Sequence, residues 1–418
     1  MANVRCSNIL LFLTTVLICL AAGEVAVRFA AEDDGLGNLV VGGTRLLPYA
    51  EPLDSMSKAL EHYESTTAPL MIHDPELGWV FPPCSSAQKG GCLVHYDADS
   101  LRSGGLEYAT SPAPGTLRIA IFGDSFTHGD EVSFGNTWGQ RLETMLRREG
   151  MNAEVLNFGV SGYGVDQAYL RYRKTGARYG PHLVILGFMP RDVARNLNMI
   201  RALFAPGTRK FLFSKPRFIL DGEELRLINS PAMDPADTIR TIGELSSWDL
   251  ADHEAPYGRF YRDRFIYRSR LLAFLAGRVA VADRGSEFAL DGEAATLTLA
   301  IIERFRQDVE SAGGTFLVVT FPMRRDVAGL VDGRGLAHED LLGAMAETTT
   351  VIQTEALLAG AAARSSVNAL FRPRGHYSAA GNRIVARELA RWIRSGDVDL
   401  PPTPAVESSP FLVAGVHP

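Results

Sequence analysis

The feature that most constrains the fold is an alternation of short apolar runs with amphipathic helical segments, which begins at residue 117. The apolar runs Leu117–Phe122, Glu154–Asn157 and Leu183–Gly187 have the length of buried strands. Helical segments that start near Trp138 and Val165 separate them. Strands that alternate with helices predict a parallel sheet with right-handed crossover connections, and therefore the α/β fold class.

The alternation is interrupted once. Residues 195–291 mix proline, glycine and polar turns with apolar pieces, so we interpret them as an insertion after the third strand. Regular patterning resumes with a helix over 297–309 and a buried strand, Thr315–Phe321, and a last helix runs from Ser378 to Gly396. The sequence thus predicts an α/β domain with a parallel sheet over residues 116–396.

The N-terminus has the pattern of an export signal. Arg5 precedes an uncharged stretch that ends at Gly23, and residues 9–22 are apolar apart from two threonines. Small residues at 21–23 fit a cleavage site, which predicts a periplasmic or extracellular protein. Because the apolar character continues over 25–29, a membrane anchor formed by uncleaved residues 8–23 is the alternative.

Composition and charge limit the function classes. The chain of 418 residues is 46% hydrophobic and 22% charged, as in ordinary globular proteins, and its net charge is −6. A negative balance argues against nucleic acid as a partner, because nucleic-acid binding needs a basic surface.

Residues 24–115 form a turn-rich lead-in to the α/β domain, and the Pro-rich tail over 397–418 is expected to be disordered. Cys84 and Cys92 bracket a loop of seven residues in the lead-in, and in an oxidising compartment we expect a disulfide between them. A zinc site is the rival interpretation, but a second pair of ligands at metal-site spacing is missing, so no metal is predicted.

The strongest chemical signal lies where the first strand ends, at Gly123-Asp124-Ser125. This position places a serine hydroxyl at the carboxyl edge of a parallel sheet, where open α/β folds bind ligands. Gly123 permits a tight turn, and the amides that follow are placed to face a developing oxyanion. A helix-capping serine is the alternative interpretation.

Two other segments are candidates for the same site. Residues 157–164, after the second strand, contain three glycines, so their backbone can approach a ligand closely. His376 stands two residues before Ser378, the expected cap of the last helix, where its ring can reach a serine at the sheet edge and act as a general base.

The order of Gly-Asp-Ser on the first strand, Asn-x-Gly-x-x-Gly after the second and His-x-Ser-x-x-Gly before the last helix resembles the GDSL or SGNH hydrolases. These are flavodoxin-like α/β/α esterases and acyl hydrolases without a cofactor. The resemblance implies that Ser125 is the nucleophile, His376 the general base, and the amides of Ser125 and Gly162 oxyanion donors. Residues implied to support the site are Gly123, Asp124, Asn157 and Asp192.

Two positions differ from that family's pattern. Arg191 stands where the family has an asparagine oxyanion donor, and arginine can also donate hydrogen bonds. The acid that usually lies two or three residues before the histidine is replaced by Pro373 and Arg374. A serine–histidine dyad without a local acid is therefore expected.

The function predicted from these residues is that of an exported serine hydrolase acting on a small ester, an acylated glycan or a lipid. A cell-envelope polysaccharide O-acyltransferase and a non-catalytic glycan-binding protein are the alternatives. The insertion also carries a stretch that alternates rings with arginines, Phe260–Arg270. We expect a solvated helix face with its rings in the core, and a surface for anionic glycan or lipid headgroups is the alternative.

Overall fold

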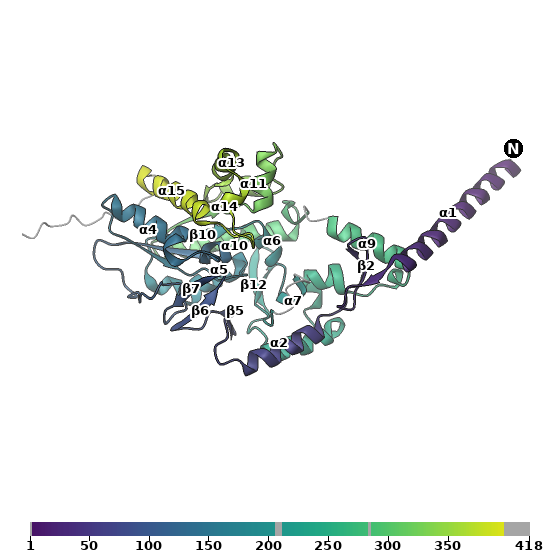
Figure 1. Cartoon of the computed structure of the whole chain (residues 1–418), viewed down its shortest axis with the longest axis horizontal. Coiled ribbons are helices and arrows are strands. Elements are labelled where there is room, and N and C mark those ends of the chain that lie inside the picture. Colours follow the sequence, from purple (N-terminus) through teal and green to yellow (C-terminus); the bar gives the residue numbers. More distant parts are fainter. Residues whose placement is uncertain (1, 205–210, 283–285, 397–418) are drawn as a thin grey trace, which may run out of the picture. The chain divides into compact units, whose positions relative to one another are not determined.

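The computed structural model describes residues 2–204, 211–282 and 286–396 (Figure 1). The chain divides into two compact units: Met1–Val80 with Val193–Thr298 form unit 1, and Phe81–Asp192 with Leu299–Pro418 form unit 2. The predicted lead-in is thus shared between the units, since the division falls at Val80. The tail predicted to be disordered lies outside the described residues.

Unit 2 contains a five-stranded sheet in the order β14-β13-β10-β8-β9, in which every neighbouring pair is parallel. Within this sheet, the strand that comes first in the chain lies between the second and the third, so the sheet is doubly wound. This confirms the predicted α/β class. The strands are β8 (Leu117–Gly123), β9 (Ala153–Asn157), β10 (Leu183–Phe188), β13 (Thr315–Thr320) and β14 (Thr350–Ile352).

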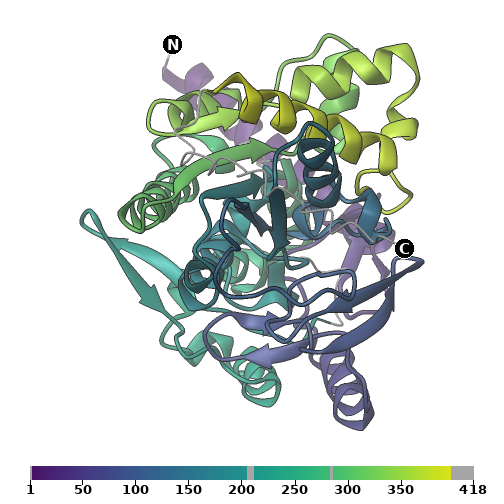
Figure 2. The same cartoon turned by 90° about the vertical axis from the view of Figure 1, so that its left-hand side faces the viewer.

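Helices cover both faces of this sheet because its strands are apolar on both sides. On one face Ile121 and Ile185 pack into a core with residues of α4 and α15, which lie side by side (Figure 2). On the other face the Phe122 ring contacts Tyr172 of α5 and Phe305 of α10. The other elements are β6 (Ser85–Lys89), β7 (Cys92–Tyr96), α3 (Ser125–His128), α4 (Trp138–Arg148), α5 (Val165–Lys174), α10 (Glu293–Ser311), α11 (Arg324–Val331), α12 (Glu339–Ala346), α13 (Glu355–Arg364), α14 (Val367–Leu370) and α15 (Ala379–Ser395).

The strand register aligns the carboxyl ends of the three central strands. Gly123 of β8 pairs with Gly187 of β10, and Ile121 of β8 pairs with Asn157, the last residue of β9. The segments that follow these strands therefore start at one edge of the sheet.

Unit 1 joins the first 80 residues to the whole of the predicted insertion, which falls within Val193–Thr298. Its core includes Leu46, Met56, Leu203, Ile242 and Ala273, which come from both parts of the chain. The principal elements are α1 (Ala2–Ala30), β1 (Glu32–Asp33), β2 (Leu39–Val41), β3 (Thr44–Arg45), α2 (Leu53–Ser65), β4 (Ile72–Asp74), β5 (Gly78–Val80), α7 (Arg201–Phe204), β11 (Arg217–Asp221), β12 (Glu224–Ile228), α8 (Pro235–Gly243), η6 (Phe265–Arg268) and α9 (Arg270–Ala282).

The predicted disulfide is wrong. Cys84 and Cys92 are both free thiols, because the loop between them folds as the hairpin of β6 and β7. Cys92 pairs with Lys89 at the turn, whereas the Cys84 amide donates to the Asp97 carbonyl at the far end. At about 3.4 Å per residue the hairpin separates the two Cα atoms far beyond the roughly 7 Å that a disulfide spans.

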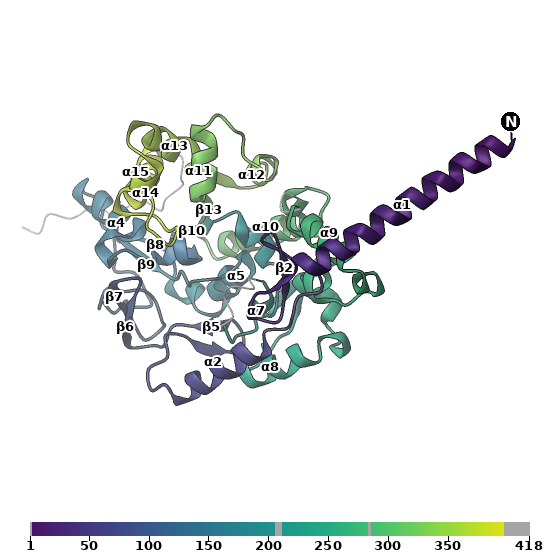
Figure 3. The ribbon, with the colours of Figure 1, turned by 45° about the vertical axis from the view of Figure 1, so that its right-hand side comes forward.

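The N-terminal segment is one continuous helix, α1, which extends away from the rest of unit 1 (Figure 3). Among the described residues it is the one helix long and apolar enough to cross a membrane, over Asn8–Ala30. Its length and composition fit a signal sequence or a membrane anchor.

Candidate active site

Ser125 is the first residue of α3 and follows β8 after a tight turn. Asp124 caps this short helix, since its carboxylate accepts from the Phe126 amide at 2.8 Å. Gly123 has φ +145, and a Cβ there would lie 2.5 Å from Thr127 Oγ1 and 2.6 Å from the Gly187 carbonyl oxygen. Only glycine fits this turn, which presents Ser125 at the edge of the sheet.

His376 lies against Ser125. Its Nε2 is 2.9 Å from Ser125 Oγ, although 251 positions separate the two residues in the chain. The histidine precedes α15, whose N-cap Ser378 accepts from the Ala380 and Gly381 amides. The ring of Phe126 lies beside the imidazole, with centroids 5.4 Å apart. The structure thus brings together the two residues on which the sequence-based prediction depends.

A third residue, which the sequence analysis missed, completes the arrangement. Glu131 Oε2 is 2.8 Å from His376 Nδ1, and Oε1 accepts from the Arg374 amide at 3.3 Å. The side chain is buried and the backbone has φ +66, a conformation that non-glycine residues seldom adopt. An acid therefore meets the far nitrogen of the imidazole, but it comes from the loop after the serine instead of the segment before the histidine.

Arg102 holds the loop that carries Glu131. Its guanidinium donates to the carbonyl oxygens of His128 at 2.6 Å, Gly129 at 2.5 Å and Val132 at 2.6 Å. The side chain is only 1% exposed, so these bonds form away from competing water. Arg102 thereby fixes the backbone on both sides of the left-handed Glu131.

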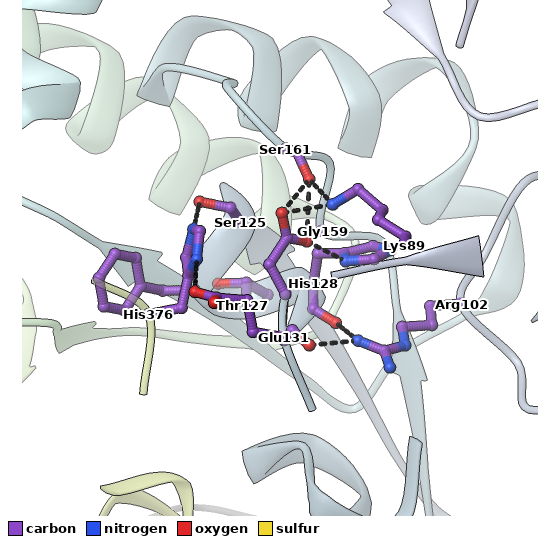
Figure 4. A network of polar contacts seen from close by, with 12 residues as sticks. Lys89, Arg102, Ser125, Thr127, His128, Glu131, Gly159, Ser161 and His376 are labelled. Atoms are coloured by element: carbon purple, nitrogen blue, oxygen red, sulfur yellow. Dashed lines mark hydrogen bonds and ion pairs between the residues drawn. The ribbon is translucent and has the colours of Figure 1, made fainter. Parts of the chain in front are cut away.

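The neighbouring Asp130 is the centre of a second, half-buried network. Its partners Lys89, His128 and Ser161 lie close together in Figure 4. It forms an ion pair with Lys89, and its Oδ1 lies 2.6 Å from His128 Nδ1. Both carboxylate oxygens accept from Ser161 Oγ at 3.0 Å, and Lys89 Nζ also donates to Ser161 Oγ at 2.6 Å. The network connects the loop that follows Ser125 to the glycine-rich segment after β9.

Burial and charge fix the protonation states in this network. Burial, aided by the Lys89 cation, lowers the pKa of His128 to about 3, so the imidazole is neutral at pH 7. Burial alone would raise the pKa of Asp130, but Lys89 and His128 hold it well below its usual range. Burial raises the pKa of Tyr96, whose hydroxyl stays protonated and lies 3.1 Å from His128 Nε2. The neutral ring therefore donates from Nδ1 to Asp130 and accepts at Nε2 from Tyr96.

The predicted supporting residues hold the loops at the sheet edge. Asn157 Nδ2 donates to the Thr127 carbonyl at 2.9 Å, and its Oδ1 accepts from the Gly159 amide at 3.0 Å. Asp192 is buried and accepts from the Met189 amide at 3.0 Å, which shapes the turn after β10.

The two remaining oxyanion candidates lie on the segments predicted for them. Gly162 has φ +88 in the loop after β9. Arg191 begins the short helix α6 (Arg191–Arg195), which follows β10. The assignment of Gly162 and Arg191 as oxyanion donors stays a prediction.

Comparison with known protein families finds no matching family model, and comparison with curated proteins finds no match. Solved structures of low identity are similar to this chain. An acetyl xylan esterase is 13% identical, with 66% of this chain and 100% of that chain covered and a TM-score of 0.35. An acetylxylan esterase from Geobacillus stearothermophilus is 14% identical, with 68% and 95% covered and a TM-score of 0.37. A lipolytic protein of the G-D-S-L family from Veillonella parvula is 14% identical, with 66% and 96% covered and a TM-score of 0.35.

Proposed function

We propose that this chain is an exported serine hydrolase that cleaves carboxylic esters with Ser125, His376 and Glu131 as its catalytic residues. The observation that carries the proposal is the relay from Ser125 Oγ to His376 Nε2 at 2.9 Å and from His376 Nδ1 to Glu131 Oε2 at 2.8 Å. A hydroxyl, an imidazole and a carboxylate in this order are the parts that activate a serine for attack on an acyl carbon.

The proposed reaction has two halves. Ser125 Oγ attacks the ester carbonyl carbon while His376 Nε2 takes the hydroxyl proton, and a tetrahedral intermediate forms. His376 then gives that proton to the departing alkoxide, which leaves an acyl-Ser125. Water attacks the acyl-enzyme with His376 again as the base, and release of the carboxylic acid restores the serine. Glu131 keeps the Nδ1 proton on the ring and stabilises the imidazolium in both halves.

The oxyanion formed in each half needs donors at the same sheet edge. We assign this task to the backbone amides of Ser125 and Gly162, with the Arg191 side chain in place of a neutral amide donor. An arginine there adds a positive charge to the site, which favours a developing oxyanion more strongly than an asparagine does.

The proposed substrate is a small ester, or an acyl group on an envelope glycan or lipid. An O-acyltransferase uses the same acyl-enzyme and differs only in its acceptor. Incubation with a polysaccharide acceptor tells the two apart: a hydrolase releases free acid, whereas a transferase leaves the acyl group on the sugar. The complete relay argues against a non-catalytic glycan-binding protein, because binding needs no ordered hydroxyl, imidazole and carboxylate.

The proposal is tested with Ser125→Ala on p-nitrophenyl acetate. We expect kcat/KM to fall by about 10³-fold or more, because no nucleophile remains, while the melting temperature stays nearly unchanged. The matched control is Ser133→Ala, which removes an exposed serine from the same stretch of chain and keeps wild-type activity. Equal turnover by the wild type and Ser125→Ala contradicts the assignment.

A further inference from the structure

The C-terminal end of α1, which we call its base, is packed into unit 1. Val27 is buried in the core of this unit, together with Leu46, Leu47 and Ala273. Gly23 lies so close to α9 that a Cβ there would be 3.0 Å from Leu271 Cδ2. The last two turns of α1 are therefore part of the folded unit, although the preceding turns are exposed.

Glu24 joins α1 to the start of α9. Its Oε1 accepts from the Arg270 amide at 3.0 Å, and its Oε2 accepts from the Leu271 amide at 2.9 Å and from Ser269 Oγ at 2.7 Å. Glu24 directly follows the predicted cleavage site, so cleavage there would cut the helix at the start of its packed base.

Exposed apolar side chains surround this base, and we call them the base patch. On α9 the positions 272, 275 and 279 recur at helical spacing and face solvent, while Ala273 and Gly277 of the same helix are buried. Of the rings in Phe260–Arg270, Tyr261 and Tyr267 are buried in the core as expected and Phe260 packs against it. Phe265 differs from the expectation, because it is 78% exposed. The members of the base patch are Val25, Phe29, Phe265, Ile266, Leu272, Leu275 and Val279.

The length of α1 determines how deep the base patch would lie in a bilayer that α1 crosses. Residues 6–23 carry no charge and form 18 consecutive helical positions. At 1.5 Å per residue they span about 27 Å, close to the roughly 30 Å of a hydrocarbon core. The charged pair of Glu24 and Arg28 then lies at the membrane surface, and the base patch lies beside it.

The charges around the base patch fit anionic lipid headgroups. Residues 264–282 contain four arginines and no acidic residue. Arg264, Arg268 and Arg278 are exposed, and the Arg268 guanidinium lies over the Phe265 ring, 4.7 Å from its centroid. A ring with an arginine above it suits the headgroup boundary, where the ring enters the apolar region and the cation meets phosphate.

We propose that α1 is retained as a membrane anchor and that the base patch lies in the boundary between headgroups and acyl chains of the same bilayer. The exposed stripe on α9 acts as an interfacial helix next to the spanning helix. This contact is independent of the chemistry proposed for Ser125.

The test uses the full chain, one copy per nanodisc, in phosphatidylethanolamine and phosphatidylglycerol. The four cysteines are replaced by serine, and Val279→Cys is labelled with an environment-sensitive fluorophore. We expect a lipid with a quencher high on its acyl chain to reduce the emission by about twofold or more, because the label lies at that depth. The matched control is Leu220→Cys, which labels an exposed apolar position on β11 in the same unit.

Equal quenching at the two positions overturns the proposal. Leu275→Cys gives a second reading if the Val279 variant fails to fold. The proposal is also overturned if the label is shielded only when a disc holds two copies of the chain, because a second copy then covers the base patch. Retention of α1 is read from the intact mass of protein from the membrane fraction: a mature N-terminus at Glu24 contradicts the anchor.

Discussion

At the scale of single residues, the acid of the relay determines how the candidate site works. Glu131 holds the His376 ring by its Nδ1 and is itself held by the Arg374 amide. Glu131→Gln keeps the size of the side chain but removes the charge and allows the wrong ring tautomer. We expect kcat/KM for p-nitrophenyl acetate to fall by about 10²- to 10⁴-fold. Glu347→Gln, an exposed glutamate on the surface of unit 2, is the control and keeps full activity. If Glu131→Gln keeps full activity, Glu131 is not needed for catalysis and only Ser125 and His376 remain as catalytic residues.

The buried ring of His128 makes the stability of the folded protein depend on pH. The pKa of His128 is about 3 in the folded protein, well below the usual value near 6.5 of an unfolded chain. Between these values the unfolded state binds one more proton, so the free energy of unfolding falls as the pH falls through this window. The slope is about 1.4 kcal/mol per pH unit near pH 5.

Chemical denaturation at pH 7, 6 and 5 checks this prediction. His128→Asn removes the titrating group, so the difference in unfolding free energy between variant and wild type shrinks as the pH falls. His62→Asn, at an exposed position on α2, serves as the control and follows the wild type. A difference between His128→Asn and wild type that is constant with pH contradicts the buried neutral ring.

At the scale of elements, the turn from β8 to α3 depends on one glycine. In Gly123→Ala the new Cβ meets Thr127 Oγ1 and the Gly187 carbonyl at distances that no relaxed contact allows. We expect a loss of about 2–4 kcal/mol in unfolding free energy, measured by denaturant titration. Gly150→Ala is the matched control: it also has positive φ, at +87, but open space around it, so it loses only about 1 kcal/mol. Equal losses for the two variants mean that close packing does not set the geometry of the turn.

The elements also explain which parts of the fold and site the sequence predicts. The strands β8, β9, β10 and β13 follow from short apolar runs, whereas the edge strand β14 was not predicted because it is only three residues long and is not buried. Ser125 and His376 were found from local patterns, because the parallel order of the strands defines the edge of the sheet. Glu131 was missed because its role depends on a left-handed backbone and on a contact with a residue 245 positions away. A disulfide was expected from the short loop between Cys84 and Cys92, but pairing of β6 with β7 moves the two thiols to opposite ends of a hairpin.

At the scale of the whole molecule, the chain leaves unit 2 after Asp192 and returns to it at Leu299. The relay lies entirely in unit 2, which carries Ser125, Glu131 and His376, whereas α1 and the base patch belong to unit 1. The proposed chemistry and the proposed membrane contact are thus built by separate units, and a variant in the base patch is expected to leave ester hydrolysis unchanged.

The catalytic relay is tested most directly by labelling the full chain with a fluorophosphonate, followed by peptide mass spectrometry. An activated serine displaces fluoride and forms a covalent phosphonyl ester, whereas an ordinary serine does not react. We predict a single adduct on Ser125, its loss in His376→Ala, and slower formation in Glu131→Gln. An unlabelled Ser125 in the folded wild-type protein, or labelling that is equally fast in His376→Ala, contradicts the proposed catalytic relay.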